Sequence, residues 1–366
     1  MRMTRRLALL GAACLVGASA TARLAQVTPQ QSDLVAALVA RFLTLRPAPA
    51  VSVAVWDGPG PIWTRAWGKA DVENDVPATP KALFRLASIS KPFTAVAVLR
   101  LVEMGQLRLD APVQKYLPKY PKKKWPITIR QLLCHQSGIR HNRAPDYDNT
   151  RHFASPTASL EIFAKDPLLF EPGTHTFYST YGYVLLGAII EAVTGKPYAE
   201  FVRAEVLVPA GIETMCPDDV FAIIPHRASG YRLRRDGALE NCALVDTSHK
   251  TPGGGWLGTA EDPVRLVRAL MRGKILKEET RTLMWTPQRL KNGTITGFGL
   301  GWNIADERGL HVIEHSGGQQ GTNTHLVFAP DRHLAVAVLL NLEEGGAKNL
   351  AMDILAALAG PAAAAH

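Results

Sequence analysis

The chain has 366 residues, 47 % of them hydrophobic and 20 % charged, which describes a globular protein with ample length for a buried core. Its formal charge is +9 at pH 7, but three of the positive charges, Arg2, Arg5 and Arg6, lie in the leader described next. The remaining sequence has no basic helix, no zinc-ligand spacing and no aromatic platform motif, so nucleic acid is not an expected partner.

Residues 1–22 have the three parts of a bacterial signal peptide: a basic start, an apolar stretch over 8–16, and small residues over 17–22. The apolar stretch is too short for a stable membrane span. Cys14 lacks the leucine that a lipoprotein signal has three residues earlier, so a lipoprotein or a retained anchor is the less favoured alternative. The leader therefore predicts export to the periplasm or secretion.

The next residues predict a helix followed by a hairpin. Residues 28–45 carry apolar side chains at helical spacing, and Pro47 ends the pattern. Residues 51–56 alternate as a half-buried strand does, residues 57–60 form a turn, and residues 62–68 fit a returning strand. This order indicates an antiparallel sheet.

The stretch 84–104 contains the tetrad S-x-x-K, from Ser88 to Lys91, and continues with apolar residues that fit a buried helix. If the helix begins at Ser88, Lys91 lies one turn further on the same face, and Pro92 stands where a missing N–H costs least. A hydroxyl, an amine and the amides of a helix N-terminus are what acyl transfer requires. The tetrad alone is a weak signal, so its partners must support it.

The middle of the chain is rich in predicted helices. We expect a short capped helix over 128–135, loop over 140–156, and a helix around 159–165. An apolar helix over 181–193 is closed by Gly195, with Ser179 or Thr180 as its N-cap. Tyr178 would then stand at the mouth of this helix.

Strands dominate the last third. Short strands are predicted at 231–234 and 242–245, and the glycine run 253–255 fits either a bulge or a close approach to a ligand. An acidic helix start follows at 259–262. Further strands are predicted at 297–304, 310–314, 324–328 and 334–340, and a tail helix at 350–358.

Strands at both ends of a helix-rich middle predict an α+β fold, an antiparallel sheet flanked by helices with a helical insertion domain. Residues 28–80 and 230–360 would form the split sheet domain, and residues 81–229 the mostly helical domain.

Cysteine and histidine spacing gives no sign of a metal or a disulfide framework. Cys134, Cys216 and Cys242 allow one bridge at most, and Cys134 stands in an apolar run that predicts a buried thiol. His311 and His315 are four apart, but their surroundings read as strand, where this spacing builds no helical metal face. We therefore predict neither a metal nor another cofactor.

Three marks line up along the chain: Ser88-x-x-Lys91, Tyr178-Ser179-Thr180 and His315-Ser316-Gly317. In this order and at these intervals the sequence resembles the superfamily of class C β-lactamases and penicillin-binding proteins, which implies the β-lactamase/transpeptidase-like fold. Residues 132–138, 170–173 and 253–256 are similar to that superfamily as well. The runs 70–77, 137–141 and 284–287 resemble its mitochondrial serine β-lactamase-like branch.

The resemblance implies roles for these residues. Ser88 would be the nucleophile, Lys91 its base, and Tyr178 the group that passes a proton between Ser88 and the leaving group. The backbone amides of Ser88 and Gly318, the latter beside Gly317, would bind the oxyanion.

Two positions depart from the pattern of the superfamily. His315 stands where many relatives have the lysine of a K-T-G strand; it can donate a hydrogen bond, but it is charged only below about pH 6.5. Thr180 replaces the commoner asparagine of Y-x-N, which removes one amide donor. Both departures place a peptidase or an esterase ahead of a β-lactamase.

Simpler interpretations remain open for each residue. Ser88 could be only a helix cap, Tyr178 a packing residue and His315 a structural histidine, and we interpret His135 as a structural residue at a helix end. A Ser-His-Asp hydrolase is disfavoured because the chain has no G-x-S-x-G motif.

We therefore predict an exported serine hydrolase that acts through a Ser88 acyl-enzyme on a peptide or D-amino-acid amide, on a small ester, or weakly on a β-lactam. The alternative is a weak or inactive member that serves as a filament-forming or binding scaffold, because the mitochondrial branch is associated with filament assembly. A homo-oligomer stays open in either case.

Overall fold

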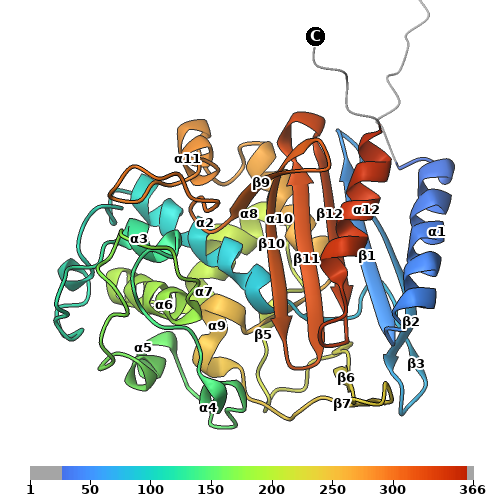
Figure 1. Cartoon of the computed structure of the whole chain (residues 1–366), viewed down its shortest axis with the longest axis horizontal. Helices are drawn as coiled ribbons and strands as arrows, with labels where there is room; N and C mark the ends of the chain where they lie inside the picture. The colour runs from blue at the N-terminus through green and yellow to red at the C-terminus, as the bar shows by residue number, and fades with distance from the viewer. Residues whose placement is uncertain (1–26, 361–366) are drawn as a thin grey trace, which may run out of the picture.

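The computed structural model describes residues 27–360, so the predicted leader lies outside the described residues (Figure 1). Its centre is a seven-stranded antiparallel sheet in the order β3-β2-β1-β12-β11-β10-β9. The strands are β1 (Ala50–Asp57), β2 (Trp63–Asp71), β3 (Val76–Pro77), β9 (Asn303–Glu307), β10 (Leu310–Gln319), β11 (Thr322–Ala329) and β12 (Leu334–Leu340).

The first and last long strands of the chain pair at the middle of the sheet, where Val53 of β1 lies opposite Val338 of β12. The sheet is therefore completed only when strands from both ends of the sequence pair with each other. The fold class is as predicted, an antiparallel sheet flanked by helices.

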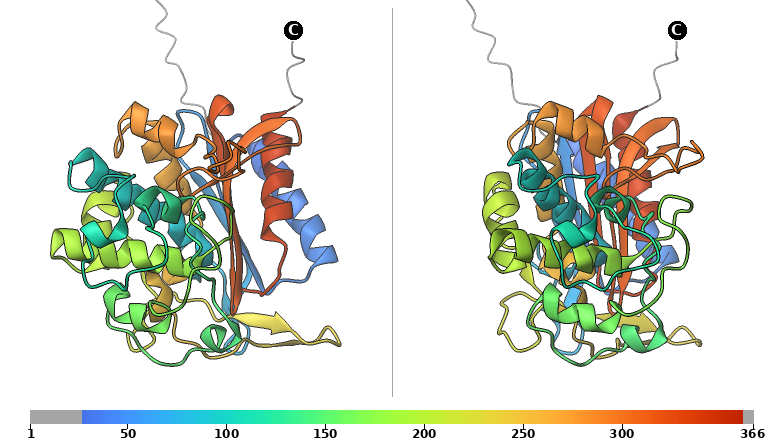
Figure 2. Two further views of the ribbon diagram at one scale, coloured as in Figure 1. Left: turned by 60° about the vertical axis from the view of Figure 1, so that its left-hand side comes forward. Right: turned by 90° about the vertical axis from the view of Figure 1, so that its left-hand side faces the viewer.

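Helices cover both faces of this sheet. On one face, Val53 and Val55 pack in a core with α1 (Pro29–Leu45) and α12 (Ala347–Ala359). On the other face, Ala54 and Trp56 share a core with α2 (Ser90–Glu103) and α10 (Glu261–Met271). Seen edge-on, the sheet separates α1 and α12 from the helix-rich part (Figure 2, left). The expectation of a half-buried first strand is wrong for this reason: β1 is buried on both faces.

The caps predicted for the helices over 128–135 and 181–193 agree with the structure. Thr128 caps α3 (Ile129–Leu133) with a reciprocal capping box, and Thr28 does the same for α1. Ser179 caps α6 (Thr180–Thr194), with its Oγ accepting from the Gly182 amide at 2.9 Å. Gly195 ends α6 at φ +67°, a conformation that favours glycine.

Smaller elements connect the two halves. The short helices are α4 (Ala144–Tyr147), α5 (Pro156–Ser159), α7 (Tyr198–Val202), α8 (Val208–Ala210), α9 (Thr251–Gly254) and α11 (Glu278–Met284). A second sheet has the order β4-β8-β5, and β6 pairs with β7. These strands are β4 (Phe84–Arg85), β5 (Cys216–Pro217), β6 (Tyr231–Leu233), β7 (Leu239–Asn241) and β8 (Trp256–Gly258).

Several local predictions need correction. The helix expected around 159–165 begins earlier, as α5, because Ser155 caps it and Pro156 takes its first position. The loop 140–156 contains α4, and the strand expected at 242–245 lies instead at β7. The glycine run is no bulge, since α9 includes Gly253 and Gly254.

The strand predicted over 297–304 begins only at Asn303, where β9 starts. The backbone before Asn303 forms hydrogen bonds outside the sheet. The Leu300 amide donates to the Met284 carbonyl, and the Gly301 amide donates to the Leu133 carbonyl. Three alternating glycines allow this close approach, and a side chain on Gly299 would meet the Met284 carbonyl at 2.3 Å.

Within residues 27–360, Cys134, Cys216 and Cys242 are thiols outside any disulfide, and Cys134 is buried as predicted. No helix in that range has both the length and the apolar character needed to cross a membrane.

Candidate active site

Ser88 lies in a short 3-10 turn, η1 (Ala87–Ile89), that runs directly into α2. The prediction that the helix begins at Ser88 is therefore wrong by two residues, and Lys91 occupies the second position of α2. Ala87, just before the nucleophile candidate, has φ +48°, a conformation that non-glycine residues rarely adopt. The Thr324 hydroxyl of β11 donates to the Leu86 carbonyl at 2.9 Å and helps to hold this turn.

The Lys91 amine lies 3.0 Å from Ser88 Oγ, 3.2 Å from Thr180 Oγ1 and 2.6 Å from the Gly253 carbonyl oxygen. Lys91 is fully buried, and burial, together with the nearby Lys250 charge, holds the pKa of this amine well below its usual value. A neutral amine has two N–H groups for the Gly253 carbonyl and the Thr180 hydroxyl, and its lone pair is left for the Ser88 proton.

Tyr178 stands two residues before α6, at the mouth of that helix as predicted, and its side chain is half-buried. Its ring lies 4.4 Å from the His135 ring, and the Lys91 amine lies 4.7 Å from its centre. Burial raises the pKa of the Tyr178 phenol, although a hydrogen bond with Ser88 lowers it in part. The phenol is therefore protonated at neutral pH, while Lys91 releases its proton far more readily than an exposed lysine does.

Strand β10 forms the wall opposite α6. Gly317 packs against the turn that carries the serine so closely that a Cβ would lie 2.6 Å from the Leu86 carbonyl and 3.0 Å from the Ser88 amide nitrogen. Only glycine fits there. Its neighbour Gly318 is exposed and has open space around its Cα.

His315 is buried, and burial with the nearby Lys91 lowers its pKa to about 3, so the ring is neutral at pH 7. Its Nδ1 lies 2.7 Å from the Ser316 carbonyl oxygen. Because a carbonyl only accepts, Nδ1 carries the proton and Nε2 keeps its lone pair. His315 therefore offers the site an acceptor, which corrects the expectation of a donor at this position.

Six of the seven predicted site residues line one pocket of ≈ 350 Å³: Ser88, Tyr178, Thr180, His315, Gly317 and Gly318. The seventh, Lys91, lies beneath the pocket in contact with Ser88. A larger hollow of ≈ 690 Å³, lined by Arg85, Asp218 and Cys242 among others, contains none of the three marks. The structure thus gathers residues that are up to about 230 positions apart in the sequence around one serine.

The pocket residues that were not identified as site residues from the sequence include His141, Asn142, Lys250 and Gln319. Lys250 directly precedes the turn of Gly253, but we interpreted that stretch only for its glycines. His141 lies in a run already noted for its resemblance, and its Nδ1 accepts from the Thr180 amide at 3.1 Å. No sequence signal singles out the other two.

His135 does more than end a helix. Its Nδ1 accepts from the Ser179 amide at 3.2 Å while its ring lies against Tyr178, so it fixes the backbone and the ring of that segment together. It adopts φ +59°, and histidine is among the residues that enter this region more often than most.

This arrangement defines a class of protein. The site combines a serine paired with a buried lysine, a tyrosine at the mouth of a second helix, and a glycine-bearing strand that faces both. Together with an antiparallel sheet and a helical half, this combination is typical of the β-lactamase and transpeptidase-like serine hydrolases. The Beta-lactamase family model matches residues 35–360, and the chain belongs to this family.

Comparisons with individual proteins support the same family. The chain is 27 % identical to the human mitochondrial serine beta-lactamase-like protein LACTB, over 84 % of this chain and 76 % of that protein. It is 30 % identical to esterase EstB of Burkholderia gladioli, over 76 % and 82 %. The solved structure of the octameric penicillin-binding protein homologue from Pyrococcus abyssi superposes with a TM-score of 0.76 at 27 % identity, covering 89 % of this chain and 77 % of that one. The chain is a serine hydrolase related to the β-lactamases.

Proposed function

We propose that this protein is an exported hydrolase that cleaves ester or amide bonds through an acyl-enzyme on Ser88. The observation that carries the proposal is the distance of 3.0 Å between Ser88 Oγ and the amine of Lys91. Because burial holds the pKa of Lys91 well below its usual value, this amine is suited to act as the base beside the nucleophile.

In the first half of the reaction, the Lys91 amine takes the Ser88 proton while Oγ attacks the substrate carbonyl carbon. The negative charge on the carbonyl oxygen would be stabilised by the backbone amides of Ser88 and Gly318. Tyr178 delivers a proton to the departing oxygen or nitrogen and regains one from Lys91, and the alcohol or amine leaves. Water then attacks the acyl-enzyme, releases the acid and returns the proton to Ser88.

Among the substrates of this family, we propose a small ester, a peptide or a D-amino-acid amide ahead of a β-lactam. A fixed cation for a β-lactam carboxylate would be expected on β10, but His315 there is neutral, with its pKa lowered to about 3. The similarity to an esterase and to a penicillin-binding protein homologue supports the same order.

The test is covalent labelling. A fluorophosphonate probe should add its mass to the wild type at Ser88 and leave Ser88→Ala unlabelled, and intact-protein mass spectrometry with peptide mapping reads this directly. Labelling that persists in Ser88→Ala contradicts the proposed nucleophile. No adduct with fluorophosphonate or penicillin, together with large assemblies on a sizing column, would favour the scaffold alternative, for which an octameric homologue supplies a precedent.

One preparation can then be compared on short acyl esters, D-Ala-D-Ala peptides, ordinary peptides and nitrocefin. We propose that the protein acts in the periplasm or outside the cell, because residues 1–22 have the form of a signal peptide. N-terminal sequencing of the protein in the periplasmic fraction should show a start near residue 21 or 23. A full-length protein confined to the cytoplasm would contradict export.

A further inference from the structure

The pocket that holds Ser88 contains a second lysine with no role in the proposed reaction. Lys250 is only 4 % exposed, and it lines this pocket beside Gly253 and Gly254. It ends a 3-10 turn, η5 (Ser248–Lys250), that leads into α9. Its charge helps to lower the pKa of Lys91, so the two amines are near each other.

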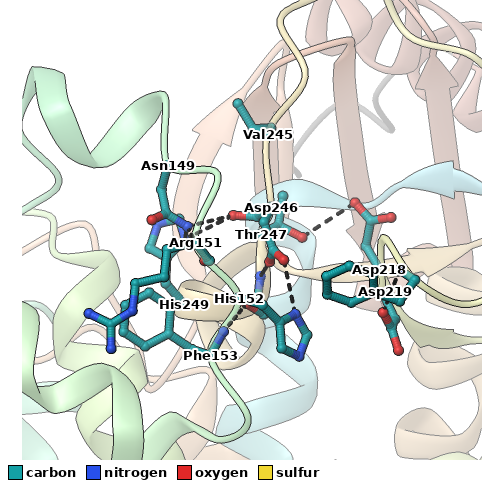
Figure 3. Close-up of polar contacts among 12 residues, drawn as sticks. Asn149, Arg151, His152, Phe153, Asp218, Asp219, Val245, Asp246, Thr247 and His249 are labelled. Atoms are coloured by element: carbon teal, nitrogen blue, oxygen red, sulfur yellow. Dashed lines mark hydrogen bonds and ion pairs between the residues drawn. The ribbon is translucent and has the colours of Figure 1, made fainter.

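The backbone before Lys250 is held firmly by the loop between α4 and α5 (Figure 3). The Asp246 amide donates to the Asn149 carbonyl at 2.8 Å, and the His152 ring lies 2.9 Å from the Asp246 carboxylate. The Lys250 amide itself donates to the Thr247 carbonyl at 3.0 Å. The position of the lysine is therefore set before any ligand arrives.

The ammonium of Lys250 lacks a counterion. Among residues 27–360 it makes no ion pair and no hydrogen bond, and Asp218, which attracts it, is engaged by Arg85 at 2.7 Å. The Nζ of Lys250 is not among the fully enclosed polar atoms, so it reaches the pocket, where an anionic ligand can replace the water that solvates it. The pocket lining that these residues form has no Asp or Glu, and its histidines His141 and His315 are neutral.

A second unsatisfied donor faces the same space. Gln319 at the end of β10 lines the pocket, and among residues 27–360 its buried amide nitrogen has no hydrogen-bond partner. The end of β10 lies beside the helix that follows Lys250, since a Cβ on Gly254 would be 3.6 Å from the Gln319 amide oxygen, an ordinary contact distance. Lys250 and Gln319 both line the same pocket.

We propose that Lys250, assisted by Gln319, binds a carboxylate carried on the acyl part of the substrate, so that the enzyme prefers acyl groups derived from dicarboxylic acids or acidic residues. This inference rests on the proposed Ser88 hydrolase. The acyl side is chosen because Lys250 is buried, whereas Ser316 and Gly318 are exposed at the mouth of the pocket. The leaving group must diffuse out through the mouth while the acyl group stays attached to Ser88.

A pair of esters that differ only in charge provides the test. We would compare kcat/KM for 4-nitrophenyl hydrogen adipate and for 4-nitrophenyl methyl adipate at pH 7, each corrected for spontaneous hydrolysis. The wild type should favour the anionic ester by roughly ten- to hundredfold, since a hydrogen-bonded charge pair in a partly dry pocket is worth that ratio.

Substitutions assign the preference to the residue. Lys250→Met should bring the ratio of anionic to neutral kcat/KM close to one, and Lys250→Arg should retain part of it. Lys165→Met, at an exposed lysine away from the pocket, should keep the wild-type ratio. A wild-type ratio of one or less overturns the inference, as does a Lys250→Met ratio equal to that of the wild type. A preference seen only when the carboxylate is on the leaving group, as in a 4-carboxyphenyl ester, overturns the assignment to the acyl side.

Fluorophosphonate labelling of each protein distinguishes a failure of the proposed Ser88 hydrolase from a failure of the inference about Lys250. If wild type is labelled at Ser88 and hydrolyses the neutral ester without an anionic preference, only the inference about Lys250 fails. If wild type is neither labelled nor active on either ester, the proposed function fails and the inference fails with it. Should Lys250→Met lose labelling through misfolding, the wild-type ratio and the Lys250→Arg ratio still decide.

Discussion

The pKa values of Lys91 and Tyr178, which both lie beside Ser88, are shifted in opposite directions. Burial lowers the pKa of the Lys91 amine and raises that of the Tyr178 phenol. The amine is therefore more readily freed to accept a proton, and the phenol still has one to give at neutral pH. The same low-polarity surroundings thus produce a base and an acid within reach of one hydroxyl.

For a neutral ester, we expect kcat/KM to rise with pH as Lys91 loses its proton and then to stay level until Tyr178 ionises, which happens only above its usual pKa of about 10. Lys91→Met, which keeps the volume and removes the base, should lower kcat by about 10²- to 10⁴-fold. Stopped-flow acylation rates from pH 4 to 10 check both statements. Turnover retained in Lys91→Met, or a decline of the wild type near pH 7, would contradict this assignment.

Strand β10 and the turn η1 form one unit although they are far apart in the sequence. Gly317 touches the backbone at Leu86 and Ser88, and Thr324 of the next strand bonds the same turn. The position of the nucleophile therefore depends on the register of a strand that folds from the other end of the chain.

Two adjacent glycines of β10 offer a matched comparison. Gly317→Ala places a Cβ within 3.0 Å of backbone atoms that cannot turn away, so we expect a loss of about 1–3 kcal/mol in stability and of at least about 100-fold in kcat/KM. Gly318→Ala meets only the Asn323 side chain, at 3.8 Å, and keeps its amide. It should retain activity within a few-fold. Equal losses of stability and of activity in the two variants, measured by chemical unfolding and ester hydrolysis, would contradict the claim that the close packing of Gly317 against η1 requires glycine.

At the scale of the whole molecule, the pocket lies where strands β9 to β11 meet the helix-rich part, because its lining includes Asn303 and His315 from the sheet and Tyr178 and Lys250 from the helical part. Two buried histidines, His249 and His315, and the half-buried His141 lie around this junction. The pKa values of His141 and His249 are lowered to about 4 and that of His315 to about 3, in each case first by burial. Each ring must stay neutral for the halves to remain packed.

Acid should therefore weaken the fold. These folded-state pKa values lie below the unfolded value of 6.5, so the unfolded chain binds protons first and the histidines' contribution to stability, complete above about pH 6.5, is lost as the pH falls toward 4. Each histidine adds a slope of up to about 1.4 kcal/mol per pH unit to the free energy of unfolding.

Urea unfolding at pH 7, 6, 5 and 4.5 measures that slope. His249→Gln, at a fully buried position outside the pocket lining, should reduce the pH dependence of the free energy of unfolding by about the contribution of one histidine. His311→Gln, at an exposed position on β10, is the control and should leave the slope close to that of the wild type. An unchanged slope in His249→Gln would show that burial of this ring does not control its protonation.

Local sequence determined the elements whose signals are local. Residues 28–45 and 181–193 became helices because caps, apolar spacing and a closing glycine agreed there. The strand over 297–302 failed because its alternating glycines serve tertiary contacts with α11 and α3, which no local pattern shows. The helix at Ser88 began late for a similar reason, since a non-local contact with β10 and β11 holds η1.

By itself, the sequence determined the kind of chemistry: a serine and a lysine one turn apart, a tyrosine before a helix and a glycine-bearing strand, in a known order. Only the tertiary structure decided that these groups share one pocket, that the pKa values of Lys91 and His315 are lowered there, and that Lys250 joins them with no counterion among residues 27–360. The physical reason is that a pKa and an unpaired charge depend on burial and on neighbours from distant segments, and neither of these is written in residue spacing.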